Sequence, residues 1–117
     1  MARKKNFDPD VKLPLGDLSQ YPNCLLIKDC VWQLKFCRQI ESGSDVGACE
    51  PNTKTIYNAI DQSRSEKFYT LIHEVIHAIE DEYGFKLRHS AVEKLERGVG
   101  DFILENFNAI NRIVLGD

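Results

Sequence analysis

The spacing of hydrophobic residues changes about halfway along the chain. In residues 30–37, CVWQLKFC, apolar and polar side chains alternate, which is typical of a strand with one buried face. The apolar members of this alternation are Trp32, Leu34 and Phe36. Residues 24–29 form a second extended run just before it, and the two runs predict a hairpin that turns near Lys28 and Asp29.

A second hairpin is predicted over residues 46–60. Pro51 and Asn52 favour a turn, and the sequence TIYNAI, residues 55–60, follows as the returning strand. Residues 41–45, ESGSD, have the composition of a loop. The first half of the chain is therefore expected to form a small, mostly antiparallel sheet of hairpins.

From Ser63 onward the apolar residues recur at helical spacing. Ser63 and Glu66 fit a capping box, in which two side chains satisfy free backbone N–H groups at a helix start. Gly84 suits the position just beyond a helix end. The apolar positions in between are Phe68, Ile72, Val75, Ile76, Ile79 and Tyr83. This pattern predicts one amphipathic helix between Ser63 and Gly84.

A last helix is predicted after a short connector, residues 85–89. Ser90 and Glu93 form a second candidate capping box at its start. One face of this helix is expected to carry Val92, Leu95, Val99, Phe102, Ile103 and Asn106. Strand hairpins followed by two helices indicate an α+β fold.

Length and composition indicate one ordinary globular domain. Of the 117 residues, 1–20 contain three turn-forming Pro or Gly residues and few apolar ones, which predicts an extended arm before a domain over 21–117. No apolar run approaches the ~20 residues of a membrane span, and no apolar segment follows the basic N-terminus as in a secretory signal. We therefore expect a cytoplasmic protein whose four cysteines are reduced. A net charge of −3 argues against a nucleic-acid partner.

The candidate chemistry lies in residues 71–84, LIHEVIHAIEDEYG. His73 and His77 stand one helical turn apart on one face, so their imidazoles can converge on one cation, and zinc is well suited to such ligands. Glu74 points to one side of His73 and can reach a water on that metal. The metal would lower the pKa of the water and polarise a carbonyl, while Glu74 takes and then delivers a proton. The motif predicts metal-assisted hydrolysis with zinc as cofactor.

A catalytic zinc usually has three protein ligands and one open position, so a third ligand is expected beyond Gly84. Glu96 is the first candidate, because a carboxylate at the edge of the last helix's apolar face needs a partner. His89 and Glu93 are the alternatives: His89 could reach in from the connector, whereas Glu93 is expected to cap the helix and face solvent. If His89 is not a ligand, it could stabilise an oxyanion, as could Tyr83.

Residues 70–84, TLIHEVIHAIEDEYG, resemble the zincin metallopeptidases in a minimal, single-domain form encoded by bacteriophages and prophages. The likeness covers residues 47–106, and it extends more loosely to SprT-like and ImmA/IrrE-like peptidases. It implies that His73 and His77 bind the metal and that Glu74 is the catalytic base.

The resemblance also bears on the third ligand and the substrate. The gluzincin branch implies Glu96, whereas the SprT-like branch implies His89. Gluzincins often place an aspartate four residues after the ligand glutamate, but that position is Gly100 here and Asp101 comes one residue later. Residues 53–60, TKTIYNAI, would correspond to the edge strand that pairs with an extended substrate.

Three functions are compatible with the motif. The first is a zinc-dependent peptidase that acts on an extended peptide or protein segment. The second is a metal-binding module that captures a peptide, or regulates a partner, without cutting it; this requires the same sheet but not Glu74. The third is a metal-dependent nuclease, which the acidic charge and the lack of a basic groove disfavour.

Overall fold

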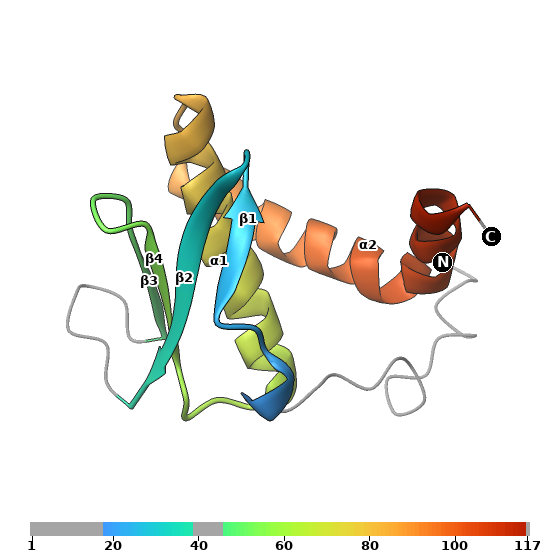
Figure 1. The fold of residues 1–117 in the computed structure, drawn as a ribbon, viewed down its shortest axis with the longest axis horizontal. Coiled ribbons are helices and arrows are strands. Elements are labelled where there is room, and N and C mark those ends of the chain that lie inside the picture. The colour runs from blue at the N-terminus through green and yellow to red at the C-terminus, as the bar shows by residue number, and fades with distance from the viewer. Residues whose placement is uncertain (1–17, 39–45, 117) are drawn as a thin grey trace.

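The chain folds as two strand hairpins followed by two helices, which confirms the predicted α+β class (Figure 1). This computed structural model describes residues 18–38 and 46–116. The elements are the 3-10 helix η2 (Leu18–Gln20), the strands β1 (Cys24–Ile27), β2 (Cys30–Cys37), β3 (Gly47–Glu50) and β4 (Thr55–Ala59), and the helices α1 (Arg64–Tyr83) and α2 (His89–Leu115). The predicted loop at 41–45 and most of the predicted arm at 1–20 lie outside the described residues.

The four strands form one sheet in the order β1-β2-β4-β3. Both predicted hairpins are present and antiparallel, and they join through a parallel pairing of β2 with β4. Lys28 and Asp29 make the first turn with positive φ values of 51° and 64°, as the favoured two-residue hairpin turn requires. The resemblance placed the edge strand at residues 53–60, and this is wrong. The parallel pairing puts β4 inside the sheet, so β3 forms the edge among the strands that the structure describes.

Helix α1 crosses one face of the sheet and provides much of the core. Trp32, Ile56 and Ala78 are fully buried at this contact. The predicted alternation in β2 holds, because Trp32 and Leu34 are buried and the intervening residues are exposed. Ala78 allows the helix to approach the sheet closely, because its methyl group is the smallest apolar side chain at the contact.

Both predicted ends of α1 are confirmed. The Ser63 hydroxyl accepts a hydrogen bond from the Glu66 N–H at 3.1 Å, and the Glu66 side chain accepts one from the Ser63 N–H at 3.2 Å. At the other end, Gly84 adopts a left-handed conformation with φ 74°, and its N–H donates to the Glu80 carbonyl.

The predicted start of the last helix is wrong. Helix α2 begins at His89, and Arg88 is its N-cap, with no side-chain hydrogen bond to the free N–H groups. Ser90 therefore lies inside the first turn, where it cannot act as the cap. Glu93 pairs instead with the His89 ring, at 3.1 Å, and His89 belongs to the helix rather than to the connector.

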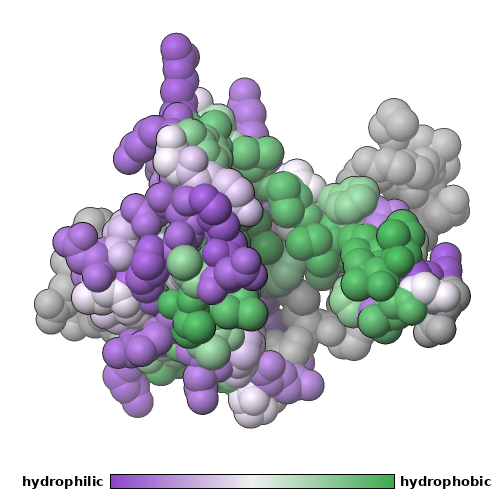
Figure 2. Space-filling model, turned by 45° about the horizontal axis from the view of Figure 1, so that its top comes forward, coloured by the Kyte–Doolittle hydropathy of each residue, from purple (hydrophilic) through white to green (hydrophobic). Residues whose placement is uncertain are grey.

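Helix α2 packs against α1 and against none of the described strands. Its most buried residues are Val92, Gly100 and Leu104, and a Cβ on Gly100 would meet the Tyr69 ring at 2.7 Å. The apolar face expected from the sequence is only partly covered: Leu95, Val99 and Phe102 are exposed. Figure 2 shows hydrophobic side chains gathered along this helix. The exposed ones further along it are Phe107, Ile113, Val114 and Leu115.

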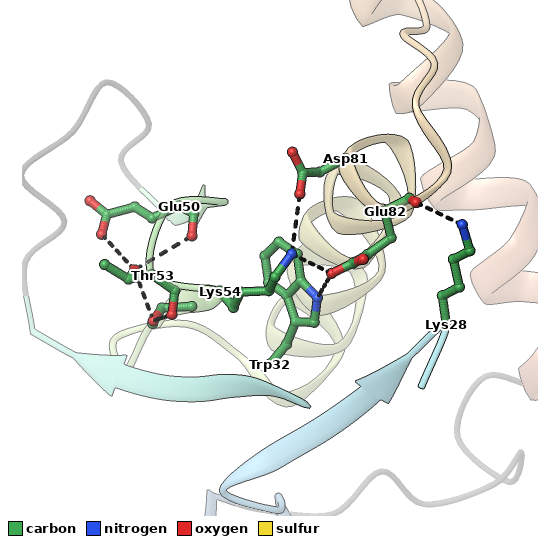
Figure 3. A network of polar contacts seen from close by, with 8 residues as sticks. Lys28, Trp32, Glu50, Thr53, Lys54, Asp81 and Glu82 are labelled. Carbon is green, nitrogen blue, oxygen red and sulfur yellow. Dashed lines mark hydrogen bonds and ion pairs between the residues drawn. The ribbon is translucent and has the colours of Figure 1, made fainter. Parts of the chain in front are cut away.

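A polar network holds the end of α1 to the sheet (Figure 3). The Trp32 indole donates to the Glu82 carboxylate at 2.8 Å, and the Lys54 ammonium contacts the same oxygen at 2.6 Å. These two contacts hold the pKa of Glu82 below its ordinary value. Lys28 adds a hydrogen bond to the Glu82 carbonyl at 3.2 Å. The last turn of α1 is thus tied to both hairpin turns.

Two further findings concern the helices and the cysteines. No helix among the described residues is both long enough and apolar enough to cross a membrane. Cys24, Cys30, Cys37 and Cys49 are all free thiols.

The difference between the two helix starts can be measured. Ser63→Ala removes a cap that accepts a backbone N–H, so we expect it to lower the free energy of unfolding by about 1 kcal/mol. Ser90→Ala is the matched control, and its effect should stay within about 0.5 kcal/mol. Urea denaturation of both variants checks this, and an equal loss in the two would contradict the assigned start of α2.

Candidate functional site

A cleft of about 850 Å³ opens between the edge strand β3, the second half of α1 and the start of α2. Residues of β3 form one wall, and the motif residues of α1 form the floor. Its lining includes Gly47, Ala48, Cys49, His73, Glu74, His77, Glu80, Asp81, Phe85, Lys86 and His89. The structure therefore brings His73, Glu74 and His77, the defining residues of the HExxH motif (His-Glu-x-x-His, residues 73–77), into one cavity with His89.

His73 and His77 lie one turn apart on α1, with ring centroids 4.9 Å apart. The Nδ1 atom of each ring contacts a glutamate: His73 contacts Glu96 at 2.9 Å, and His77 contacts Glu80 at 2.7 Å. A carboxylate on Nδ1 favours the tautomer with its proton there, which leaves the lone pair on Nε2. Both rings are thus arranged with Nε2 as the nitrogen available to a cation.

Glu74 lines the cleft on the side where Gly47 of β3 lies close to α1. Its side chain is almost fully buried, with 4% of the residue exposed. A Cβ on Gly47 would lie 2.8 Å from the Glu74 Oε2 atom, so only glycine leaves room for the carboxyl group. Burial away from water, with the nearby charge of Glu96, raises the pKa of Glu74 to about 7.

Glu96, the expected third ligand, lies behind His73 and is not among the residues that line the cleft. One carboxylate oxygen contacts the His73 Nδ1 atom, and the other lies 3.6 Å from the Arg97 Nε atom. The Arg97 guanidinium stacks 4.1 Å above the ring of Tyr69, whose hydroxyl donates to Asp101. In this arrangement Glu96 orients the His73 ring from the side away from the cleft.

The aspartate expected four residues after Glu96 is absent for a steric reason. Gly100 occupies that position because the Tyr69 ring packs against it. Asp101, which comes one residue later, binds the hydroxyl of the same tyrosine. Residue 100 therefore sets the distance between the helices, and Asp101 helps to hold α1 against α2.

His89 reaches the cleft, whereas Glu93 and Tyr83 do not line it. The His89 ring lies 5.9 Å from the His73 ring, and its Nε2 atom pairs with Glu93. The His89 side chain is 71% exposed, so this ion pair is weak and can be exchanged at little cost. Tyr83 stacks instead under the Lys28 ammonium, 4.8 Å from it.

Glu80 is a site residue that the sequence analysis missed. Burial alone would raise its pKa, but the hydrogen bond from the Leu87 N–H and the contact with His77 hold that pKa below its ordinary value. A signal was present, because Glu80 follows the apolar Ile76 by four residues and so shares the buried side of the helix. A carboxylate on such a face needs partners, as Glu96 does.

The chemistry of the residues around the cleft fits a zinc ion. Within residues 18–38 and 46–116, no three His, Cys, Asp or Glu side chains are already placed to hold one metal ion. Three imidazoles bound tetrahedrally to zinc have ring centroids about 5 Å apart. The His73–His77 and His73–His89 separations of 4.9 Å and 5.9 Å are close to this. The exposed His89 side chain would have to turn away from Glu93 to join such a set.

Cys49, on the strand side of the cleft, does not fit a nucleophile. Burial, together with the negative charge of Glu74, raises the pKa of its thiol to about 12. The group therefore stays protonated near neutral pH, where only a thiolate would react.

Comparisons of this chain with protein-family models, curated proteins and solved structures find no match. The zincin resemblance therefore depends on the motif residues and remains a prediction.

The raised pKa of Glu74 makes a prediction about stability. The folded protein holds this proton more tightly than the unfolded chain, whose glutamate titrates near 4.5. Stability is therefore lost as the pH rises from about 4.5 through about 7. Glu74→Gln cannot ionise, so with a chelator present it should stabilise the protein by about 1–3 kcal/mol more at pH 8 than at pH 5.

Urea denaturation at the two pH values measures this difference. Glu105→Gln, which changes an exposed glutamate far from the cleft, should show no such dependence. An equal effect of Glu74→Gln at both pH values would mean that Glu74 is not buried as described.

Proposed function

We propose that this protein is a zinc-dependent peptidase that hydrolyses an extended peptide segment laid along β3. The observation that carries the proposal is the arrangement of α1. His73, Glu74 and His77 line one cleft, and each histidine has a glutamate on its Nδ1 atom. Histidines that bind zinc nearly always donate their other ring N–H to a carboxylate, a carbonyl or a water.

His73, His77 and His89 would hold the metal, and Glu96 and Glu80 would orient the first two. The ring separations support this set, and the position of Glu96 behind His73 favours His89 as the third ligand. Zinc bound there would act as a Lewis acid on the substrate carbonyl and would make a water nucleophilic near neutral pH.

Glu74 would be the general base. Its carboxylate would take a proton from the attacking water and then deliver it to the nitrogen of the departing amine. Burial raises the pKa of Glu74 in the metal-free protein, and a bound cation would lower it again and so favour the carboxylate form that accepts the proton. Its burial beside Gly47 restricts the positions that the carboxyl group can take.

The strand β3 supports a peptide as the substrate. It forms one edge of the sheet, and three of its residues, Gly47, Ala48 and Cys49, line the cleft. An extended peptide can bind along the edge strand of a sheet as an added strand. The lining carries Glu74, Glu80 and Asp81 but one basic side chain, Lys86, which disfavours a phosphodiester substrate.

Loss of the base provides the direct test of hydrolysis. We expect Glu74→Gln to lower cleavage of a denatured, fluorescently labelled protein by zinc-loaded enzyme by at least about 100-fold. Zinc content should be retained, because Glu74 is not a ligand. Glu105→Gln is the control and should cleave at the wild-type rate.

Two results would contradict the proposed mechanism. Full activity of Glu74→Gln would remove Glu74 as the base. Zinc and peptide binding without any cleavage by the wild type would instead identify a peptide-capture module.

The third ligand is tested separately by zinc titration. His89→Ala should lower zinc affinity by roughly 1,000-fold, the share of one ligand in a structural or catalytic site. Glu96→Ala should lower it about 10–100-fold, as expected for a group that orients a ligand. A larger loss in Glu96→Ala than in His89→Ala would reassign the third position to Glu96.

A further inference from the structure

Glu80 makes two contacts that lead to different parts of the candidate site. Its Oε1 atom lies 2.7 Å from the His77 Nδ1 atom, and its Oε2 atom accepts a hydrogen bond from the Leu87 N–H at 2.6 Å. The side chain is 6% exposed, so water competes little for either oxygen. Both oxygens are therefore used, one by a ring of α1 and one by the backbone after α1.

The contact with Leu87 is important because α2 lacks a cap of its own. Leu87 comes one residue before Arg88, the N-cap, whose side chain makes no capping hydrogen bond. His89, the first residue of the helix, follows directly. The Glu80 carboxylate thus holds the backbone at the point where the chain turns into α2, two residues before His89.

The same carboxylate sets the state of His77. With the proton on Nδ1 donated to Glu80, the Nε2 atom keeps its lone pair. The Glu80 backbone also ends the helix, because its carbonyl accepts hydrogen bonds from the N–H groups of Gly84 and Phe85. One residue therefore contacts a candidate ligand, the end of α1 and the connector to α2.

We infer that Glu80 is a positioning residue, which selects the metal-binding tautomer of His77 and fixes the connector that carries His89 to the cleft. This inference rests on the proposed function, because the contacts of Glu80 with His77 and with Leu87 are both taken to serve the same proposed metal site. It extends that function by linking a ligand on α1 to a ligand on α2 through a single buried carboxylate.

The test uses the metal-free protein, so that its outcome does not depend on zinc binding. Long-range ¹H–¹⁵N NMR at pH 8 with a chelator reports which nitrogen of each neutral histidine carries the proton. We expect wild-type His77 to carry it on Nδ1. Glu80→Gln can offer one oxygen to the Leu87 N–H and turns an NH₂ group toward His77, so the proton should move to Nε2.

Hydrogen exchange of the Leu87 amide tests the second contact. Glu80→Ala leaves this N–H without its acceptor, so its exchange should speed up at least about 10-fold. Glu82→Gln is the matched control: it changes a half-buried glutamate two residues further along α1 that binds Trp32 and Lys54. It should leave both the His77 tautomer and the Leu87 exchange rate unchanged.

Zinc affinity provides a third readout, expected to fall about 10–100-fold in Glu80→Gln. A proton on Nε2 in wild-type His77, or a tautomer and exchange rate unmoved by the Glu80 variants, would overturn the inference even if zinc binds. If the wild type binds no zinc, the proposed function fails, while the NMR and exchange data still decide the role of Glu80. The wild-type tautomer is measured without any variant, so misfolding of a variant cannot conceal the result.

Discussion

The close approach of α1 to the sheet is the constraint on which the rest of the structure depends. Ala78 is fully buried in the core against Trp32 and Ile56. Near the start of β3, a Cβ on Gly47 would meet Thr70 at 2.7 Å and Glu74 at 2.8 Å. A helix held this tightly cannot rotate about its axis without breaking the packing. The face that carries the histidines is therefore fixed by the opposite, apolar face.

Polar contacts at both ends of α1 keep it in this position. Near its start, the buried Asn58 donates to the Lys67 carbonyl and accepts from Gln62, which in turn accepts from the Thr70 hydroxyl. Near its end, Glu82 receives Trp32 and Lys54. Buried polar groups of this kind favour one arrangement over others, because any shift would leave them without partners.

Much of the fold could be predicted from local patterns in the sequence. The alternation in β2, the Ser63 cap and Gly84 each depend on neighbours within a few residues, so the elements they mark were placed correctly. The position of β4 inside the sheet was not predictable in this way, because it depends on a parallel pairing with the distant β2. The start of α2 was also missed, since a serine and a glutamate at cap spacing do not reveal that Glu80 holds the preceding connector.

The candidate site, like the fold, could be predicted only in part from the sequence. The HExxH motif identified His73, Glu74 and His77, but the roles of Glu96 and Glu80 depend on which nitrogen of each ring they meet. For Glu96 this depends on the packing of α1 against α2, where Gly100 leaves room for the Tyr69 ring, whereas the Glu80 contact lies within α1. The expectation that Glu96 needs a partner was sound; the partner it meets in the structure is a histidine.

The placement of these groups on one helical hairpin has a consequence for folding. His73 and Glu96, which are in contact across the two helices, are 23 residues apart in the chain. Gln33 and Thr55, which pair between β2 and β4, are 22 residues apart. Because the entropy cost of closing a loop depends on its length, the helical hairpin and the parallel strand pairing cost about the same to close. The candidate site and the strand wall beside it are therefore comparable in contact order.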